Sequence, residues 1–231
     1  MSRQRPIVDF VVLCIGREGS TYLDGLLASH PGIEALGELF NSQHGWPAVG
    51  LPHPDAAAAL SAAVLDARPA VVGLKLPWDS LVASPELVPL LRDPAIRIVR
   101  LQRRNGLAQY LSQELANATG VFHSHQGVQP ADPIRLDPAA CIHWLRSTRL
   151  FNRLLDEVAS GHPTFTIEYT ELQDPARITA LQDFLGVARA TLHSPHRKVR
   201  TVPMPAVIEN WDELVAALAG TEWEACLVEE P

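Results

Sequence analysis

The sequence predicts an α/β fold of three layers, in which a mostly parallel central sheet is flanked by helices around a P-loop-like nucleotide-binding core. Short apolar runs with the pattern of buried strands alternate along the chain with segments of helical periodicity, which is typical of βαβ connections. The chain has 231 residues, 47% of them hydrophobic, which is enough for one sizeable core. We therefore expect a single domain over residues 1–231.

The first strand is expected from Phe10 to Ile15, a continuous apolar run that contains two adjacent valines. Such a run is typical of a strand buried on both faces. It leads into the glycine turn Gly16-Arg17-Glu18-Gly19. After this turn, Ser20 or Thr21 is expected to cap a helix.

A glycine turn between a strand and a helix is an anion site, because backbone N–H groups and the positive end of the helix dipole converge there. Arg17 adds a cation beside it. Only two residues separate Gly16 from Gly19 and no lysine precedes Ser20, so an ordinary ATPase or kinase is disfavoured. On this stretch alone a second interpretation stays open, in which the glycines only make a tight connection.

The first half of the chain continues with a stop signal at residues 30–32 and a short strand expected at residues 33–36. Gly37 and Glu38 then lie just beyond the C-terminal end of a strand, where ligands bind in open α/β sheets. Residues 41–55 lack periodicity and are expected to form a loop. An alanine-rich helix at 56–67 precedes a strand at 71–76 that carries Lys75, which either reaches the ligand or extends to solvent.

In the second half, a helix at 85–92 and a strand at 96–101 precede a helix at 106–118. Asn105 is expected to cap that helix and Gly120 to end it. Residues 121–136 are irregular, and Asp137 or Pro138 starts a long helix that reaches about residue 159. A strand at 164–167, a helix at 175–185 and a closing helix at 206–218 complete the pattern.

The net charge of −7 makes nucleic acid or an anionic membrane an improbable partner. Positive charge is local instead, in residues 100–104 and 196–200, which suits a small anionic ligand. No apolar stretch has membrane-spanning length, and no signal peptide is recognised. The three scattered cysteines fit a reducing compartment, so we expect a cytoplasmic protein without structural zinc.

Two further groups of residues suit phosphate. Arg104, at the end of the strand at 96–101, is followed eight residues later by Ser112, about two turns into the next helix. A guanidinium and a hydroxyl from one strand–helix pair can bind a second phosphate. Near the end of the chain, Arg197 and Lys198 can fold over the same phosphate.

In these motifs the sequence resembles the PAPS-dependent sulfotransferases, whose donor PAPS is 3′-phosphoadenosine 5′-phosphosulfate, and especially the bacterial branch of the trehalose sulfotransferase type. The resemblance runs from about Val11 to Leu227. Each motif alone is weak, but their order and spacing together are fairly specific. The matching stretches are Arg17-Glu-Gly-Ser-Thr-Tyr-Leu23, Gly37-Glu38, Val72-Gly-Leu-Lys-Leu-Pro-Trp78, Arg104-Asn-Gly-Leu-Ala-Gln-Tyr-Leu-Ser112 and Ile208-Glu-Asn-Trp-Asp-Glu-Leu214.

The resemblance implies PAPS as co-substrate, a small-molecule hydroxyl as acceptor (carbohydrate, glycolipid or secondary metabolite) and no metal. It implies that Glu38 is the general base and that Arg17 supports catalysis. The donor-binding residues that it implies are Arg17, Glu18, Gly19, Ser20, Thr21 and Tyr22 for the 5′-phosphosulfate, Arg104 and Ser112 for the 3′-phosphate, and Arg197 and Lys198 as a further clamp.

Two positions depart from the family pattern. Glu18 stands where the family usually has serine, and Val199 follows Arg197-Lys198 where many members have glycine. A carboxylate beside a bound phosphosulfate is repulsive unless it points away or pairs with Arg17. Two alternatives therefore stay open, a non-catalytic protein that binds PAPS and a nucleotide-dependent kinase, and so does the choice between monomer and homodimer.

Overall fold

The structure of the protein is a computed structural model that describes residues 7–41, 55–65, 71–122, 133–196 and 202–230. Its centre is a five-stranded sheet in the order β2-β3-β1-β4-β5, and every neighbouring pair of strands is parallel. The strands are β1 (Phe10–Cys14), β2 (Ile33–Ala35), β3 (Val71–Pro77), β4 (Arg97–Gln102) and β5 (Thr164–Glu168). The predicted α/β class with a parallel sheet is confirmed.

The strand order has a switch point between β1 and β4. From β1 the chain proceeds toward the β2 edge of the sheet, whereas from β4 it proceeds to β5 at the opposite edge. In open α/β sheets, ligands bind outside the carboxyl ends of the strands at such a point. A binding site is therefore expected at the loops that follow β1 and β4.

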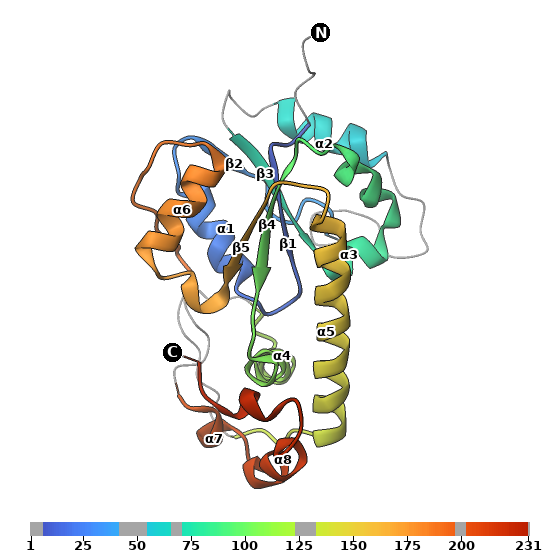
Figure 1. Cartoon of the computed structure of the whole chain (residues 1–231), viewed down its shortest axis with the longest axis vertical. Coiled ribbons are helices and arrows are strands. Elements are labelled where there is room, and N and C mark those ends of the chain that lie inside the picture. The colour runs from blue at the N-terminus through green and yellow to red at the C-terminus, as the bar shows by residue number, and fades with distance from the viewer. Residues whose placement is uncertain (1–6, 42–54, 66–70, 123–132, 197–201, 231) are drawn as a thin grey trace.

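Helices cover both faces of the sheet (Figure 1). On one face, Phe10, Val12 and Cys14 of β1 pack in a buried cluster with α1 (Ser20–Ala28) and α6 (Pro175–Leu185). On the other face, Val11 and Leu13 pack with the second group of helical segments. That group consists of α2 (Ala56–Leu65), α3 (Trp78–Ala83), the 3-10 helix η2 (Pro85–Arg92) and the C-terminal part of α5 (Pro138–Ala159).

A third buried cluster lies beyond the carboxyl ends of the strands, where α4 (Gly106–Thr119) packs against the N-terminal part of α5 (Figure 1). It is completed by α7 (Met204–Val207), α8 (Trp211–Leu218) and the 3-10 helix η4 (Glu224–Leu227). A third 3-10 segment, η3 (Tyr169–Glu171), follows β5 directly. Because α4 is fixed by this cluster, the residues on its first two turns are held firmly at the switch point.

The expected caps of the later helices are confirmed. Asn105 accepts a hydrogen bond from the N–H of Ala108 at 2.9 Å, and Gly120 ends α4 in the left-handed conformation. The cap expected for the first helix is wrong. Gly19 is the N-cap of α1 and no side chain bonds the helix end, so neither Ser20 nor Thr21 caps it.

Three other elements differ from the expectation. The segment 85–92 is a 3-10 helix with Pro89 inside it, and the short helix α3 was not expected. The closing helix is divided, because Ile208 is extended and forms a bridge with Ile134. Asn210 fixes the division, since its side chain bonds both the N–H and the carbonyl of Leu136, at 2.9 and 2.8 Å.

Within the part of the chain that the structure describes, no helix combines the length and the apolar character needed to cross a membrane.

Candidate functional site

The loop after β1 has an unusual backbone. Arg17 is in the left-handed region with φ of 67°, and Gly19 follows with φ of 86°. Between them the chain reverses direction and enters α1 at Ser20. The first N–H groups of a helix have no partner inside the helix. The first turn of α1, which holds Ser20, Thr21 and Tyr22, therefore directs backbone donors toward the carboxyl edge of the sheet.

Gly19 is packed too closely to carry a side chain. A Cβ atom there would lie 2.7 Å from Cδ2 of Tyr169 and 2.9 Å from Cδ1 of Leu172, both just after β5. Gly16 is different, since a Cβ atom would meet nothing within 4 Å and φ is not positive. The second glycine of the loop is thus required by the fold, whereas the first has room for a methyl group.

We expect Gly19→Ala to lower the free energy of unfolding by about 1–3 kcal/mol, because an L residue pays for left-handed φ and must also displace the Tyr169 ring. Urea unfolding of the variant against the wild type measures this. The matched control is Gly16→Ala, for which we expect a smaller change. Equal losses in both variants would contradict this interpretation of the loop.

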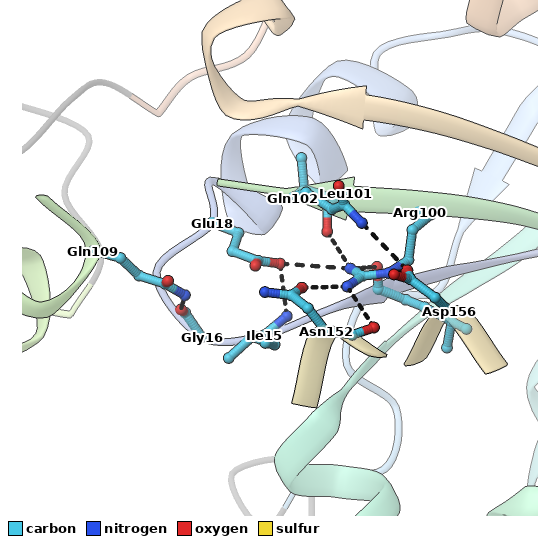
Figure 2. A network of polar contacts seen from close by, with 10 residues as sticks. Ile15, Gly16, Glu18, Arg100, Leu101, Gln102, Gln109, Asn152 and Asp156 are labelled. Atoms are coloured by element: carbon cyan, nitrogen blue, oxygen red, sulfur yellow. Dashed lines mark hydrogen bonds and ion pairs between the residues drawn. The ribbon is translucent and has the colours of Figure 1, made fainter. Parts of the chain in front are cut away.

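Glu18 points away from the outer side of the loop. Its side chain is fully buried, and Oε2 accepts a hydrogen bond from the N–H of Ile15 at 2.8 Å (Figure 2). Oε2 also lies 3.9 Å from Nη1 of Arg100 on β4. Burial raises the pKa of Glu18 to about 8, which the Ile15 amide, the Arg100 guanidinium and the Arg103 backbone amide offset only in part. A carboxylate at position 18 repels a bound anion less if it points away from the anion or pairs with Arg17. The structure has the first arrangement, because the carboxylate is directed toward Ile15 and Arg100.

Arg17 joins the loop to α4. Its Nε donates to the Ser112 hydroxyl at 3.2 Å, and its Nη1 donates to the carbonyl of Phe122 at 2.8 Å. Gln109, one turn before Ser112, donates to the carbonyl of Gly16 at 2.7 Å. Burial and the neighbouring Arg103 both lower the pKa of Arg17 from its ordinary value. The structure thus brings together two of the predicted site residues, Arg17 and Ser112.

Arg103 is a site residue that the sequence analysis did not single out. Its guanidinium donates to the carbonyl of Arg17 at 3.2 Å and lies over the Tyr169 ring, 4.2 Å from its centroid. Both carboxylate oxygens of Glu230 accept from it, at 2.6–3.0 Å. The side chain is only 8% exposed, so it supports the loop from inside. In the sequence, only the position of Arg103 among the basic residues 100–104 indicated a role in binding an anion.

Arg104, the neighbour of Arg103, has the opposite environment. Its side chain is 86% exposed, and its Nε lies 2.9 Å from Oε1 of Glu168 at the end of β5. In the structure Arg104 contacts Glu168, whereas Ser112 contacts Arg17. Arg104 and Ser112, which are predicted to bind one phosphate together, thus have different partners in this structure. Arg197 and Lys198 lie outside the described residues.

Glu38 lies beyond β2 in an ion pair with Lys75 of β3, at 2.8 Å between Oε1 and Nζ. Its Oε2 accepts from the side-chain amide of Asn41 at 2.6 Å. Gly37 provides the turn with φ of 60°, and its carbonyl accepts the N–H of Lys75 at 2.9 Å. Lys75 is only 5% exposed, so of its two expected arrangements the one that extends to solvent is wrong, and its ammonium contacts Glu38.

Other titratable groups surround this ion pair. Burial raises the pKa of Asp24 on α1 and of Asp79 on α3, and the carboxylate of Glu38 raises both further. Burial raises the pKa of the Cys14 thiol to about 12, so Cys14 is a neutral residue of the core. Among the described residues, no three His, Cys, Asp or Glu side chains are grouped so that they could hold a metal ion.

No protein-family model matches the chain. Among curated proteins it is similar to Nodulation protein H of Rhizobium meliloti strain 1021, with 26% identity over 223 residues that cover 90% of each chain. A second Nodulation protein H, of Rhizobium meliloti, is 25% identical over 219 residues and 89% of each chain. Each relative is thus matched over most of its length.

Among solved structures, the chain is similar to a sulfotransferase from Alicyclobacillus acidocaldarius. The TM-score is 0.55 at 16% sequence identity, and the match covers 99% of this chain and 98% of the other. The match shows that the two chains share their overall fold.

Proposed function

We propose that the protein is a PAPS-dependent sulfotransferase that transfers the sulfuryl group from PAPS to a hydroxyl of a small acceptor. The observation that carries this proposal is the loop after β1, where Arg17 and Ser112 meet beside the first turn of α1 and the side chain of Glu18 points inward. The shared fold with a sulfotransferase and the order of the motifs along the chain support it.

The loop suits the 5′-phosphosulfate end of the donor. Backbone N–H groups from Gly19 to Tyr22, together with Arg17, would stabilise the charge that builds on the departing phosphate. Losing one such donor typically costs about 2.7–4 kcal/mol in the transition state. Glu18 takes part through its backbone alone, because its carboxylate is directed toward Ile15 and Arg100.

Arg104 and Ser112 are proposed to bind the 3′-phosphate, with Arg197 and Lys198 as a further clamp. The present partner of Arg104 does not prevent this. Arg104 itself is 86% exposed, so its guanidinium can turn toward a phosphate, although Glu168, which is only 12% exposed, then loses its ion pair. The buried pair of Arg103 with Glu230 is the more costly one to break.

Glu38 is proposed as the general base. In the transfer, the acceptor oxygen forms a bond to sulfur while the bond from sulfur to the donor phosphate breaks, and Glu38 takes the hydroxyl proton. The products are a sulfate ester and adenosine 3′,5′-bisphosphate. Lys75 keeps the carboxylate in place at the carboxyl edge of the sheet. By analogy with phosphoryl transfer, positioning and charge stabilisation supply most of the catalysis, and the proposal assigns no metal to it.

Binding of adenosine 3′,5′-bisphosphate tests the proposed donor site. At a hundredfold excess over its dissociation constant, the bisphosphate is expected to stabilise the protein by about 2.7 kcal/mol. Thermal unfolding with the bisphosphate, and with ATP as the comparison ligand, measures this. Stabilisation by ATP and not by the bisphosphate would favour a nucleotide-dependent kinase and would contradict the proposal.

Replacing Arg104 by alanine is expected to weaken bisphosphate binding about 10- to 100-fold, because a hydrogen bond to a charged group contributes about 1.5–3 kcal/mol. Calorimetric titration measures the dissociation constant. Arg189→Ala is the matched control, since Arg189, just after α6, is an exposed arginine that pairs with Asp183 in α6, and its removal should leave the affinity unchanged. Wild-type affinity in the Arg104 variant would remove Arg104 from the site.

A further inference from the structure

The carboxyl group of Glu18 is buried directly beneath the loop that is proposed to bind the donor. Figure 2 shows the side chain directed toward Ile15 and Arg100, on the side of the loop opposite to the contact of Gln109 with Gly16. Oε2 receives the Ile15 N–H, whereas no side chain among the described residues donates a hydrogen bond to the buried Oε1. Glu18 is thus in position to hold the loop and to carry a charge below it.

Arg100 cannot neutralise this charge fully, because a second carboxylate shares it. Its Nε donates to Oδ1 of Asp156 on α5 at 2.9 Å, closer than the 3.9 Å contact to Glu18. The rest of the guanidinium bonds the carbonyls of Leu13 and Leu101 and the side chain of Asn152 (Figure 2). When both carboxyl groups are ionised, the group Glu18–Arg100–Asp156 carries one net negative charge.

Titratable groups on β4, α5, β5 and β1 surround Glu18. Arg100 lies on β4 with Asp156 of α5 behind it, and Glu168 at the end of β5 adds a second carboxylate that opposes the ionisation of Glu18. Cys14 at the end of β1 couples electrostatically to Glu18, but its own raised pKa keeps it neutral. Burial is the largest of the effects, so Glu18 is poised to change its charge near neutral pH.

We propose that Glu18 is a positioning residue of the donor loop and that its carboxylate takes up one proton from solvent when the anionic donor binds. The inference rests on the proposed function, because it requires an anion on the outer side of the loop. Protonation converts the carboxylate to a neutral carboxyl group and removes its repulsion of the donor. One carboxyl oxygen still accepts the Ile15 N–H, so the loop keeps its conformation.

Proton uptake makes donor affinity depend on pH. A group with a pKa of about 8 is mostly protonated at pH 7 and mostly ionised at pH 9. We therefore expect adenosine 3′,5′-bisphosphate to bind about tenfold more weakly at pH 9 than at pH 7. The ligand itself does not titrate in this range, since the second pKa of a phosphate monoester is about 6.

Isothermal titration calorimetry of the wild-type protein tests this without any substitution. At pH 8, titrations with the bisphosphate in buffers of different ionisation enthalpy should show uptake of about half a proton per site. Heats that do not depend on the buffer, with binding intact, would overturn the inference and leave the proposed function standing. Absence of binding at any pH from 6 to 9 would overturn the proposed function, and this inference with it.

The Glu18→Gln variant identifies the group responsible. Glutamine keeps an oxygen for the Ile15 N–H and cannot ionise, so the affinity should become independent of pH between 7 and 9 and exceed that of the wild type at pH 9. Glu157→Gln is the control, because this exposed residue of α5 should retain the wild-type pH dependence. An unchanged pH dependence in the Glu18 variant would assign the proton to another group and overturn the proposal.

Discussion

Replacing Glu38 by glutamine is expected to lower turnover about 10²–10⁴-fold, because an amide cannot accept the proton of the acceptor hydroxyl. The effect should be on the chemical step. Glutamine is nearly the same size and keeps one oxygen that can accept from Lys75, so the side chain should stay in place. Turnover is measured as the release of adenosine 3′,5′-bisphosphate from PAPS in the presence of an acceptor mixture.

Two controls separate loss of the base from loss of structure. The Glu38 variant should bind adenosine 3′,5′-bisphosphate with nearly wild-type affinity, since Glu38 is proposed to act on the acceptor. Glu34→Gln, the same substitution at an exposed position of β2, should keep full turnover. Full turnover in the Glu38 variant would move the base elsewhere, and Asp24, whose pKa burial raises, would be the next residue to replace.

Replacing Arg100 by methionine is expected to lower the free energy of unfolding by about 3–5 kcal/mol at pH 7. Arg100 is 1% exposed, and its guanidinium joins β4 to Glu18 in the loop and to Asn152 and Asp156 on α5 (Figure 2). Its removal leaves the buried carbonyls of Leu13 and Leu101 and the side chain of Asn152 without their donor, and it takes the cation away from Glu18 and Asp156. Urea unfolding measures the loss, with Arg189→Met as the control, since both partners of the Arg189–Asp183 ion pair are exposed and its loss should cost about 1 kcal/mol or less.

The stability loss from removing Arg100 should grow with pH. The pKa of Glu18 is raised in the folded protein, from 4.5 to about 8, so its contribution favours folding below pH 4.5 and is lost as the pH rises toward 8. Arg100 opposes this loss, because its charge lowers the pKa of Glu18. The methionine variant should therefore be further destabilised at pH 9 than at pH 6, and a loss independent of pH would show that Glu18 and Arg100 are not coupled.

The strands were the most predictable part of the fold. The run from Phe10 to Ile15 is apolar without interruption because β1 is covered on both faces, and local patterns of this kind survive folding. Asn105 and Gly120 are predictable for a similar reason, since each acts on the helix end beside it. The divided closing helix was not predictable, because its break depends on Ile134, far away in the sequence.

The candidate site was predictable as a set of residue types and less so as a set of contacts. The turn and Glu38 could be placed at the carboxyl edge because they follow strands directly. The direction of Glu18 could not be foreseen, since it depends on Arg100, which is 82 positions away and lies on another strand. The contrast between Arg103 and Arg104 likewise arises only in three dimensions, where Tyr169 and Glu230 enclose the first and leave the second exposed.

The transfer of sulfur itself tests the central claim most directly. The protein is incubated with PAPS and a small-molecule extract of the source cell, and the extract is then searched by mass spectrometry. We predict an acceptor that gains the mass of one SO₃, together with an equal amount of adenosine 3′,5′-bisphosphate, in the wild-type reaction and not with the Glu38→Gln variant. Tight binding of the bisphosphate with no sulfated product from any extract would contradict the claim and would identify a protein that binds the nucleotide without catalysis.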